Sequence, residues 1–150
     1  GWQGSETVMN RYEPSPSDRV ARQVELYEST EGREGATMLG LPCVIVTHRG
    51  RNSGAIRKTP LMRVADGDNY LLVASLGGAP RHPVWYYNLV ADPNVTIRDG
   101  AKVQQMRARL VTDPAERARV WPIAVAAFPN YAEYEKKTTR VIPVFVPEPV

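Results

Sequence analysis

Short apolar runs, many of them rich in β-branched residues, recur along the 150-residue chain and predict a set of strands. The runs expected to form strands are Val44–Thr47, Ile56–Val64, Tyr70–Ala74, Val95–Arg98, Lys102–Leu110 and Val141–Val146. Turn sequences separate neighbouring runs at Gly50–Gly54, Asp66–Asn69 and Asp99–Gly100. Pro60 lies inside the second run and has no N–H to donate, so this strand should lie at a sheet edge or carry a bulge.

Helical spacing of apolar residues appears between and around these strands. Behind the capping residue Ser17 it predicts a helix over Asp18–Ser29. Further helices are expected over Pro83–Val90, from the capping residue Asp113 to Phe128, and over Asn130–Lys137. Pro122 should bend its helix or begin a new turn, because a proline inside a helix removes one backbone hydrogen bond.

About six strands and three or four helices result, and the strands follow one another as hairpins rather than alternating with helices. This order favours a mainly β fold with added helices, an antiparallel sheet or barrel, over a doubly wound parallel sheet. The length suits one domain with one sizeable core. We therefore expect a flexible N-terminal arm over residues 1–16 and a single domain over residues 17–150, in which a helix at residues 17–30 precedes the barrel.

Composition is that of an ordinary soluble protein, with 43% hydrophobic and 23% charged residues. The net charge of +3 is too small and too scattered to indicate nucleic-acid binding. No apolar run is long enough to cross a bilayer, so no integral membrane segment is expected. Cys43 is the only cysteine and lies in an apolar run, so we interpret it as a small buried residue in a chain compatible with the reducing cytoplasm.

Several catalytic chemistries lack their usual residues. The two histidines and the single cysteine show no metal-ligand spacing, so no metal site is expected. A G-x-S-x-G elbow is absent, and the glycine turn at residues 50–54 lacks the Lys-Ser/Thr ending of a P-loop. The candidates that remain are basic and aromatic residues.

Two corners that carry glycine and basic residues are candidate anion sites. The stretch Ser75–Asn88 joins a strand end, a double-glycine corner, a basic pair and a helix start, which can hold an anion or can be a plain corner. Arg51 and Arg57 flank the turn at residues 50–54 and can bind phosphate or carboxylate, or can lie on a solvated hairpin tip. Aromatic residues, which can pack a core or stack on a flat ligand, form the third group. They are Trp85, Tyr86, Tyr87, Phe128, Tyr131 and Tyr134.

Six blocks of the sequence carry a family resemblance. They are Gly50–Gly54 with Arg57 and Pro60, Ala74–Gly78, Pro83–Leu89, Asp92-Pro93, Phe128–Tyr134 and Ile142–Val144. In this order and at this spacing they resemble the deazaflavin-dependent oxidoreductases of actinobacteria, a family that includes nitroreductases. The resemblance covers residues 36–148, and the preceding helix is also in place.

The resemblance implies a split antiparallel β-barrel of the flavin-reductase or FMN-binding type with flanking helices. It implies coenzyme F420, an 8-hydroxy-5-deazaflavin with an anionic phospholactyl-glutamate tail, as the cofactor. The positions implied to bind this cofactor are Arg51, Asn52, Arg57, Lys58, Thr59, Pro60, Ser75, Leu76, Gly77, Gly78, Trp85 and Asn88. Tyr131 and Tyr134 are implied as catalytic residues, and both line the substrate side together with Met62 and Phe128.

The implied activity is a hydride transfer from C5 of the reduced deazaflavin to an electron-poor acceptor. This acceptor is a quinone, an enone or activated alkene such as a coumarin-type lactone, or a nitro compound. Asn52 and Leu76 replace lysines of the nitroreductase, so two cationic partners of the cofactor phosphate are missing. The residues expected to compensate are Lys58, Arg81 or His82. Met62 replaces a tyrosine, which favours the quinone- and enone-reducing branch of the family.

Two other functions stay open at this point: an FMN-dependent oxidoreductase on the same barrel, and a non-catalytic carrier of the deazaflavin. We expect a cytoplasmic protein, monomeric or dimeric, that acts on a small-molecule acceptor without nucleic acid. Because a quinone dissolves in lipid, peripheral contact with a membrane also stays open.

Overall fold

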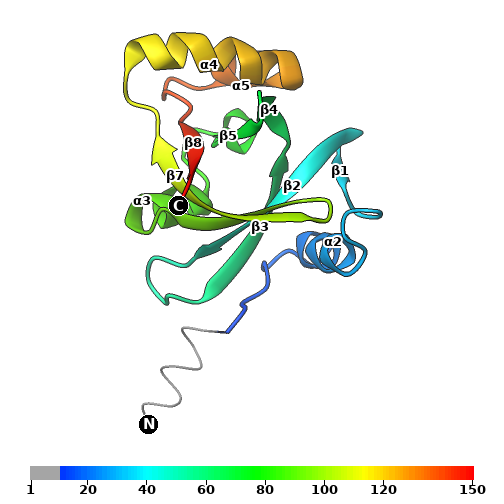
Figure 1. Ribbon diagram of the computed structural model, residues 1–150. Coiled ribbons are helices and arrows are strands. Elements are labelled where there is room, and N and C mark those ends of the chain that lie inside the picture. Colours follow the sequence, from blue (N-terminus) through cyan, green and yellow to red (C-terminus); the bar gives the residue numbers. More distant parts are fainter. Residues whose placement is uncertain (1–10) are drawn as a thin grey trace.

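Antiparallel strands make up most of the regular structure of the computed structural model, which describes residues 11–150. The strands are β1 (Thr37–Met38), β2 (Leu41–Arg49), β3 (Ile56–Met62), β4 (Val64–Asp66), β5 (Asn69–Val73), β6 (Asn94–Asp99), β7 (Lys102–Leu110) and β8 (Val144–Pro149). The helices are α2 (Asp18–Ser29), α3 (Val84–Ala91), α4 (Pro114–Ala127), α5 (Asn130–Lys137) and the short 3-10 helix η1 (Leu76–Gly78). In Figure 1 the strands curl into a barrel between α2 and the pair formed by α4 and α5.

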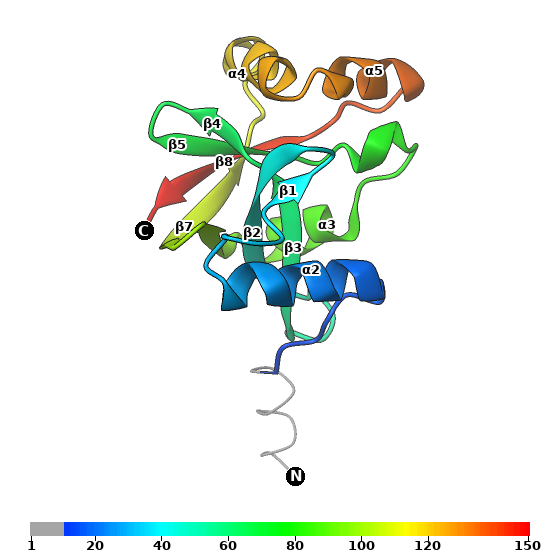
Figure 2. The ribbon, with the colours of Figure 1, turned by 90° about the vertical axis from the view of Figure 1, so that its right-hand side faces the viewer.

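The strand order confirms the predicted split antiparallel barrel with flanking helices. Neighbours run β1-β2-β6-β7-β8-β5-β4, and β3 pairs with β2. Each of these pairings is antiparallel. Pro60 lies in β3 opposite Ile45, and β3 has β2 as its one partner among the described strands, as a proline inside a strand predicts. Figure 2 shows η1 and α3 on the same side of the barrel, between α2 and α5.

β2 is buried on both of its faces, which explains its continuous apolar run. Val44 and Val46 point into the barrel, where Trp85 of α3 packs in the same core cluster. Cys43 and Ile45 point the other way and pack against α2. Because successive side chains of a strand alternate between faces, one strand thus carries part of two cores. Burial raises the pKa of the Cys43 thiol to about 11, so this residue is an inert packing group, as predicted.

The predicted helices form where their caps and periodicity place them. Ser17 Oγ accepts a hydrogen bond from the Val20 amide at 3.4 Å and begins α2 at Asp18. Asp113 caps α4 in the same way, through the Ala115 amide. α4 runs as a single helix through Pro122, without the new turn that was the alternative to a bend. Together α4 and α5 cover a second core cluster between β4, β5 and β8.

Two predicted strands have different limits in the structure. The run Ile56–Val64 is divided, because its first part pairs with β2 and its last residue begins β4, which pairs with β5. The last strand begins at Val144 rather than at Val141. Before it, the carbonyl of Ile142 accepts from Arg117 at 2.7 Å, and Pro143 has no N–H to offer a neighbouring strand.

The start of the predicted arm, residues 1–10, lies outside the described residues. Immediately after it, the backbone runs along the edge strand β3: the Glu13 amide donates to the Ile56 carbonyl at 2.8 Å, and the Ile56 amide donates to the Arg11 carbonyl at 3.0 Å. Tyr12 and Ile56 form a parallel bridge there. Over the part of the chain that the structure describes, none of the helices is both long and apolar enough to cross a membrane.

Candidate functional site

The basic turn at residues 50–54 is hydrogen-bonded to α3 through a buried asparagine. The amide of Arg51 donates to Asn88 Oδ1 at 3.0 Å, and Asn88 is only 4% exposed. The guanidinium of Arg51 lies over the Tyr87 ring, 4.8 Å from its centroid. The turn therefore holds Arg51 and the exposed Asn52 at the surface beside α3, while Asn88, also a predicted cofactor residue, lies inside the protein.

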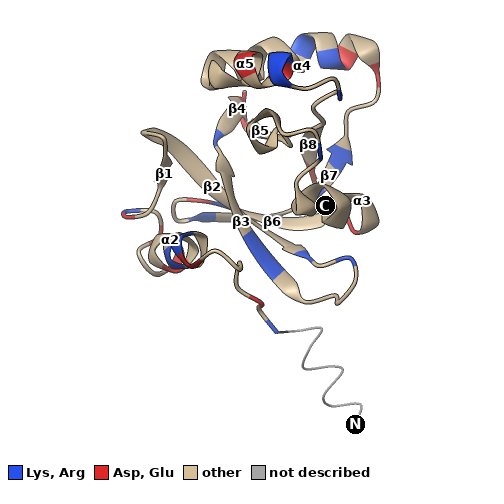
Figure 3. Ribbon diagram, turned by 180° about the vertical axis from the view of Figure 1, so that it is seen from behind, with Lys and Arg blue, Asp and Glu red and all other residues tan. Residues whose placement is uncertain are grey.

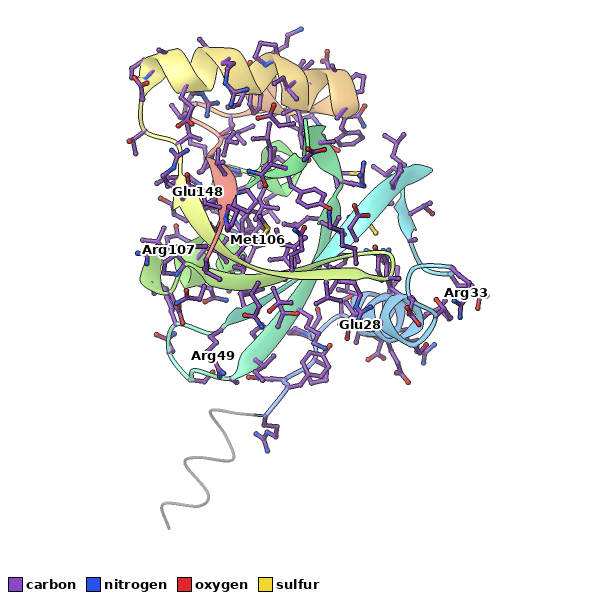
Figure 4. The ribbon with its side chains drawn as sticks, viewed as in Figure 1. Glu28, Arg33, Arg49, Met106, Arg107 and Glu148 are labelled. Carbon is purple, nitrogen blue, oxygen red and sulfur yellow. The ribbon has the colours of Figure 1, made fainter. Side chains whose placement is uncertain are left out.

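The cationic residues of β3 point to opposite faces of the strand. Arg57 lies opposite His48 on β2, on the face that α3 covers, and its side chain is 27% exposed, with a loose ion pair to Glu13 at 3.8 Å. Lys58 points toward α2 and pairs with Glu28, which Figure 4 labels on that helix. The broad basic band on β3 in Figure 3 thus belongs to two faces, and the structure does not bring Lys58 together with Arg57.

The loop around η1 leaves three consecutive backbone amides without an acceptor. Gly78 N donates to Ser75 O at 2.9 Å, but within residues 11–150 the amides of Ser75, Leu76 and Gly77 have no acceptor. Ser75 has a right-handed helical conformation, and the next three residues have positive φ angles of 44°, 63° and 81°. Such a change of hand turns successive N–H groups toward one point, which is a known anion-binding arrangement.

Arg140 holds this loop in place, and sequence reasoning did not find it. Its guanidinium donates to the carbonyls of Ala74 (3.2 Å), Ser75 (2.7 Å) and Ala79 (2.8 Å). It also donates to His82 Nδ1 at 2.9 Å, so His82 accepts there as a neutral ring. Burial and then Arg140 lower the pKa of His82. The available signal was the position of Arg140, two residues before the Ile-Pro block.

Two of the three residues expected to replace the missing lysines therefore already bind other partners within the protein. Lys58 is paired with Glu28 on the α2 side, and His82 is an acceptor for Arg140. Arg81 is exposed and remains a candidate. The structure adds Lys137 of α5, whose Cβ would lie 3.1 Å from a Cβ built on Gly78.

The predicted substrate residues gather in one cluster under α4 and α5. The cluster includes all four of them: Met62, Phe128, Tyr131 and Tyr134. Phe128 is 5% exposed and Tyr131 4%, with their rings in edge contact at 4.9 Å, so both largely pack the core. Tyr134 is partly exposed. Burial and then Tyr134 raise the pKa of the Tyr131 phenol, which therefore keeps its proton.

The glycine corner and the tyrosine helix meet directly. A Cβ built on Gly78 would lie 2.8 Å from the Tyr134 carbonyl oxygen, so only glycine allows η1 to approach α5 this closely. Leu76 and Gly77 are exposed beside this contact. Trp85, by contrast, is 8% exposed and packs its ring on Phe145 at 5.8 Å, as a core residue.

Of the predicted site residues in the basic turn, η1 and α5, those that reach the surface are Arg51, Asn52, Leu76 and Gly77, which are exposed, and Tyr134, which is partly exposed. A hollow of about 300 Å³ lies on the α2 side of the sheet, and among the predicted site residues only Lys58 lines it. No group of three or more potential metal ligands occurs among the described residues. The surface thus offers amides, guanidinium groups and phenols, which suit an anionic, partly flat organic ligand.

Comparisons with known proteins agree with this chemistry. The family model described as F420H2-dependent quinone reductase matches residues 19–149. An F420H2-dependent quinone reductase of Mycobacterium tuberculosis is 42% identical over 125 residues, which cover 81% of this chain and 83% of the relative. A second M. tuberculosis protein named for the same activity is 36% identical over 109 residues, or 73% of this chain and 91% of the relative.

Two solved structures are also similar. One, described as an F420-H2 dependent reductase, is 48% identical with a TM-score of 0.67, over 71% of this chain and 94% of the other. Another, described as a domain-swapped dimer, is 44% identical with a TM-score of 0.70, over 89% of this chain and 100% of the other.

Proposed function

Because the chain belongs to the F420H2-dependent quinone reductase family, we propose that its turn at residues 50–54, Arg57 and the η1 loop hold coenzyme F420, while the exposed side of α5 faces the acceptor. Membership makes the chain an oxidoreductase whose cofactor is coenzyme F420 and whose acceptor class is a quinone. The site residues and any finer choice of acceptor are our proposal.

The donor set of the surface fits this cofactor. Its tail carries phosphate and carboxylate groups, which need N–H donors and positive charge. The three acceptor-free amides at Ser75, Leu76 and Gly77 are the observation that carries the proposal. Arg51, which lies over Tyr87 of α3, and Arg57 supply two guanidinium groups. The helix α3 and η1 lie on the same side of the barrel (Figure 2).

When bound, the reduced deazaflavin supplies a hydride from C5 to the acceptor. The protein's task is to hold the two partners and to stabilise negative charge that develops on an acceptor oxygen. We assign the second task to phenol hydroxyls of α5. Tyr134 is partly exposed, and burial keeps the proton on the Tyr131 phenol behind it, so Tyr131 is a hydrogen-bond donor rather than an anionic base.

Enones, activated alkenes such as coumarin-type lactones, and nitro compounds are further acceptors that we propose for the same site. They share with quinones an electron-poor centre and an oxygen that becomes negative on reduction. Met62, a flexible apolar side chain in the cluster with Phe128, leaves an adaptable apolar wall for such rings.

The test is a titration of the protein with oxidised coenzyme F420 and, separately, with FMN, followed by oxidation of F420H2 in the presence of a soluble quinone. We expect deazaflavin to bind more tightly and its oxidation to depend on the quinone. Tighter FMN binding would instead favour the FMN-dependent oxidoreductase. Tight deazaflavin binding without turnover over several acceptors would favour the carrier.

Peripheral membrane contact is a second proposal, and α3 is the surface that favours it. Its outer side exposes Val84, Tyr87 and Val90, the helix carries no charged residue, and Arg51 lies over Tyr87. This pattern suits an anionic bilayer surface. Co-sedimentation with anionic vesicles, but not with neutral ones, is the expected result, and Val84→Glu should abolish it.

A further inference from the structure

A buried histidine outside the predicted site links two of its members. His48 of β2 is 4% exposed and lies between α3 and β3. Its Nδ1 atom is 3.3 Å from Asn88 Nδ2, and its Nε2 atom is 3.0 Å from Thr59 Oγ1. With the bond from the Arg51 amide to Asn88, these contacts form one hydrogen-bonded chain that runs from the basic turn to Thr59.

The direction of every bond in this chain is fixed. A backbone amide can only donate, so the Arg51 amide identifies Oδ1 as the acceptor atom of Asn88. Asn88 Nδ2 then donates to His48 Nδ1, which leaves the ring proton of a neutral His48 on Nε2. Nε2–H therefore donates to Thr59 Oγ1.

The direction of these bonds makes the Thr59 hydroxyl a hydrogen-bond donor. Its oxygen already accepts from His48, and its own hydroxyl proton has no acceptor within residues 11–150. Thr59 is partly exposed and lies two residues after Arg57, so it shares the face of β3 that carries the guanidinium. The hydroxyl is thus a hydrogen-bond donor at the surface that we assign to the cofactor.

We propose that His48 is a positioning residue, which orients the Thr59 hydroxyl as a donor to an acceptor oxygen or nitrogen of the bound deazaflavin cofactor. This inference rests on the proposed function. His48 itself is too deeply buried to touch the ligand. The neutral ring is consistent with a pKa that burial, and then Arg57, lower to about 4. The site consequently favours a ligand atom that accepts a hydrogen bond opposite Thr59 and disfavours one that donates.

The experiment measures the dissociation constant of oxidised coenzyme F420 and the thermal midpoint of each variant. Thr59→Val keeps the shape and should weaken binding about fivefold to tenfold, the effect of one lost hydrogen bond. Thr59→Ser should bind within about twofold of the natural protein. His48→Leu should lose as much affinity as Thr59→Val, and the double variant no more than either, because all three lose the same bond.

His48→Gln is the conservative control. Its Oε1 can accept from Asn88 and its Nε2 can donate to Thr59, so it should retain the affinity that His48→Leu loses. A merely structural role of His48 predicts losses that add in the double variant, and this result would overturn the inference. Thr59→Val that binds like the natural protein would also overturn it, even if His48→Leu is too unstable to measure. If the natural protein fails to bind coenzyme F420, the proposed function itself is wrong.

Discussion

Gly78 lies directly against the backbone of Tyr134. A Cβ placed on Gly78 would come within 2.8 Å of the Tyr134 carbonyl oxygen and 2.9 Å of its Cα atom, distances that no side chain tolerates. Gly78 also has a φ of +81°. One glycine therefore allows the loop proposed to bind the cofactor and the helix proposed to face the acceptor to form a single unit.

Replacement of Gly78 tests this contact, and Gly77 provides a matched control. Gly77 has a similar φ of +63°, but a Cβ there would meet no atom within 4 Å. Gly77→Ala should cost only the left-handed backbone strain, about 1–2 kcal/mol in the free energy of unfolding. Gly78→Ala should cost clearly more and should also weaken cofactor binding. Urea unfolding of both variants makes the comparison, and equal losses would show that η1 does not depend on its contact with α5.

Arg140 should stabilise the η1 loop, and with it the folded protein, more than a partly exposed arginine usually does. It donates to three carbonyl oxygens and to a histidine nitrogen, so Arg140→Lys leaves most of these acceptors without a partner. Charge-assisted hydrogen bonds contribute about 1.5–3 kcal/mol each, so we expect a loss of at least about 2 kcal/mol in unfolding free energy.

The same variant should weaken binding of coenzyme F420, because the amides of Ser75–Gly77 lose their fixed geometry. Arg119→Lys is the control, since Arg119 makes one exposed ion pair with Asp66 and should leave both stability and binding nearly unchanged. Arg140→Lys with unaltered stability would mean that the loop keeps its conformation without the guanidinium.

Local signals of the sequence predicted the elements well. Ser17 and Asp113 each cap the helix that follows, and hairpin turns set the antiparallel order, because these effects act between residues close in the chain. The split of the run at residues 56–64 depends instead on two different partner strands. Nothing within the run itself encodes this change of partner.

Side-chain direction and distant contacts limited the prediction of the site. Lys58 was grouped with Arg57, but neighbouring residues of a strand face opposite sides, and the register that assigns those sides comes from β2. Arg140 is more than 60 residues from the loop that it holds. Asn88 and Trp85 belong to the predicted set, yet both are buried, so any part they have in the proposed site is indirect.

Arg57 and Lys58 form a matched pair for the proposed cofactor site. Arg57→Ala removes a partly exposed guanidinium and should weaken binding of coenzyme F420 by roughly 1.5–3 kcal/mol, if it makes a charge-assisted bond to the tail. Lys58→Ala removes the same charge one residue away, on the α2 face, and should leave the dissociation constant unchanged. If both variants lose the same affinity for coenzyme F420, Arg57 attracts the cofactor at long range and does not contact it. If Arg57→Ala loses no affinity, Arg57 is not part of the site.

Lys137 is the candidate replacement for the cation that Leu76 does not supply. Its stem passes η1 at Gly78, and its ammonium group lies 5.6 Å from the Tyr134 ring centroid. Lys137→Ala should raise the dissociation constant of coenzyme F420 roughly three- to tenfold and reduce its dependence on salt. Lys136→Ala is the control, because Lys136 pairs with Glu133 on the same helix. If the dissociation constants of the two variants depend on salt in the same way, Lys137 does not contact the cofactor.

His48 should make the protein less stable as the pH falls. Its pKa is lowered from 6.5 to about 4 in the folded chain, first by burial and then by the charge of Arg57. Above pH 6.5 the ring is neutral in both states and contributes nothing to the pH dependence. Between pH 6.5 and 4 only the unfolded chain takes up the proton, so the free energy of unfolding falls, by about 3 kcal/mol when the change is complete below pH 4.

His48→Gln isolates this contribution, because every other titratable group is present in both proteins and cancels in the difference. Urea unfolding at several pH values from 7 to 4 should give curves that converge or cross as the pH falls, since only the natural protein loses the His48 contribution. Parallel curves over this range would mean that the folded protein accepts a proton on His48. A protonated ring carries a hydrogen on Nδ1, so Nδ1 could no longer accept from Asn88 Nδ2. Asn88 could then not both face His48 with Nδ2 and accept from the Arg51 amide with Oδ1, as the proposed chain of bonds requires.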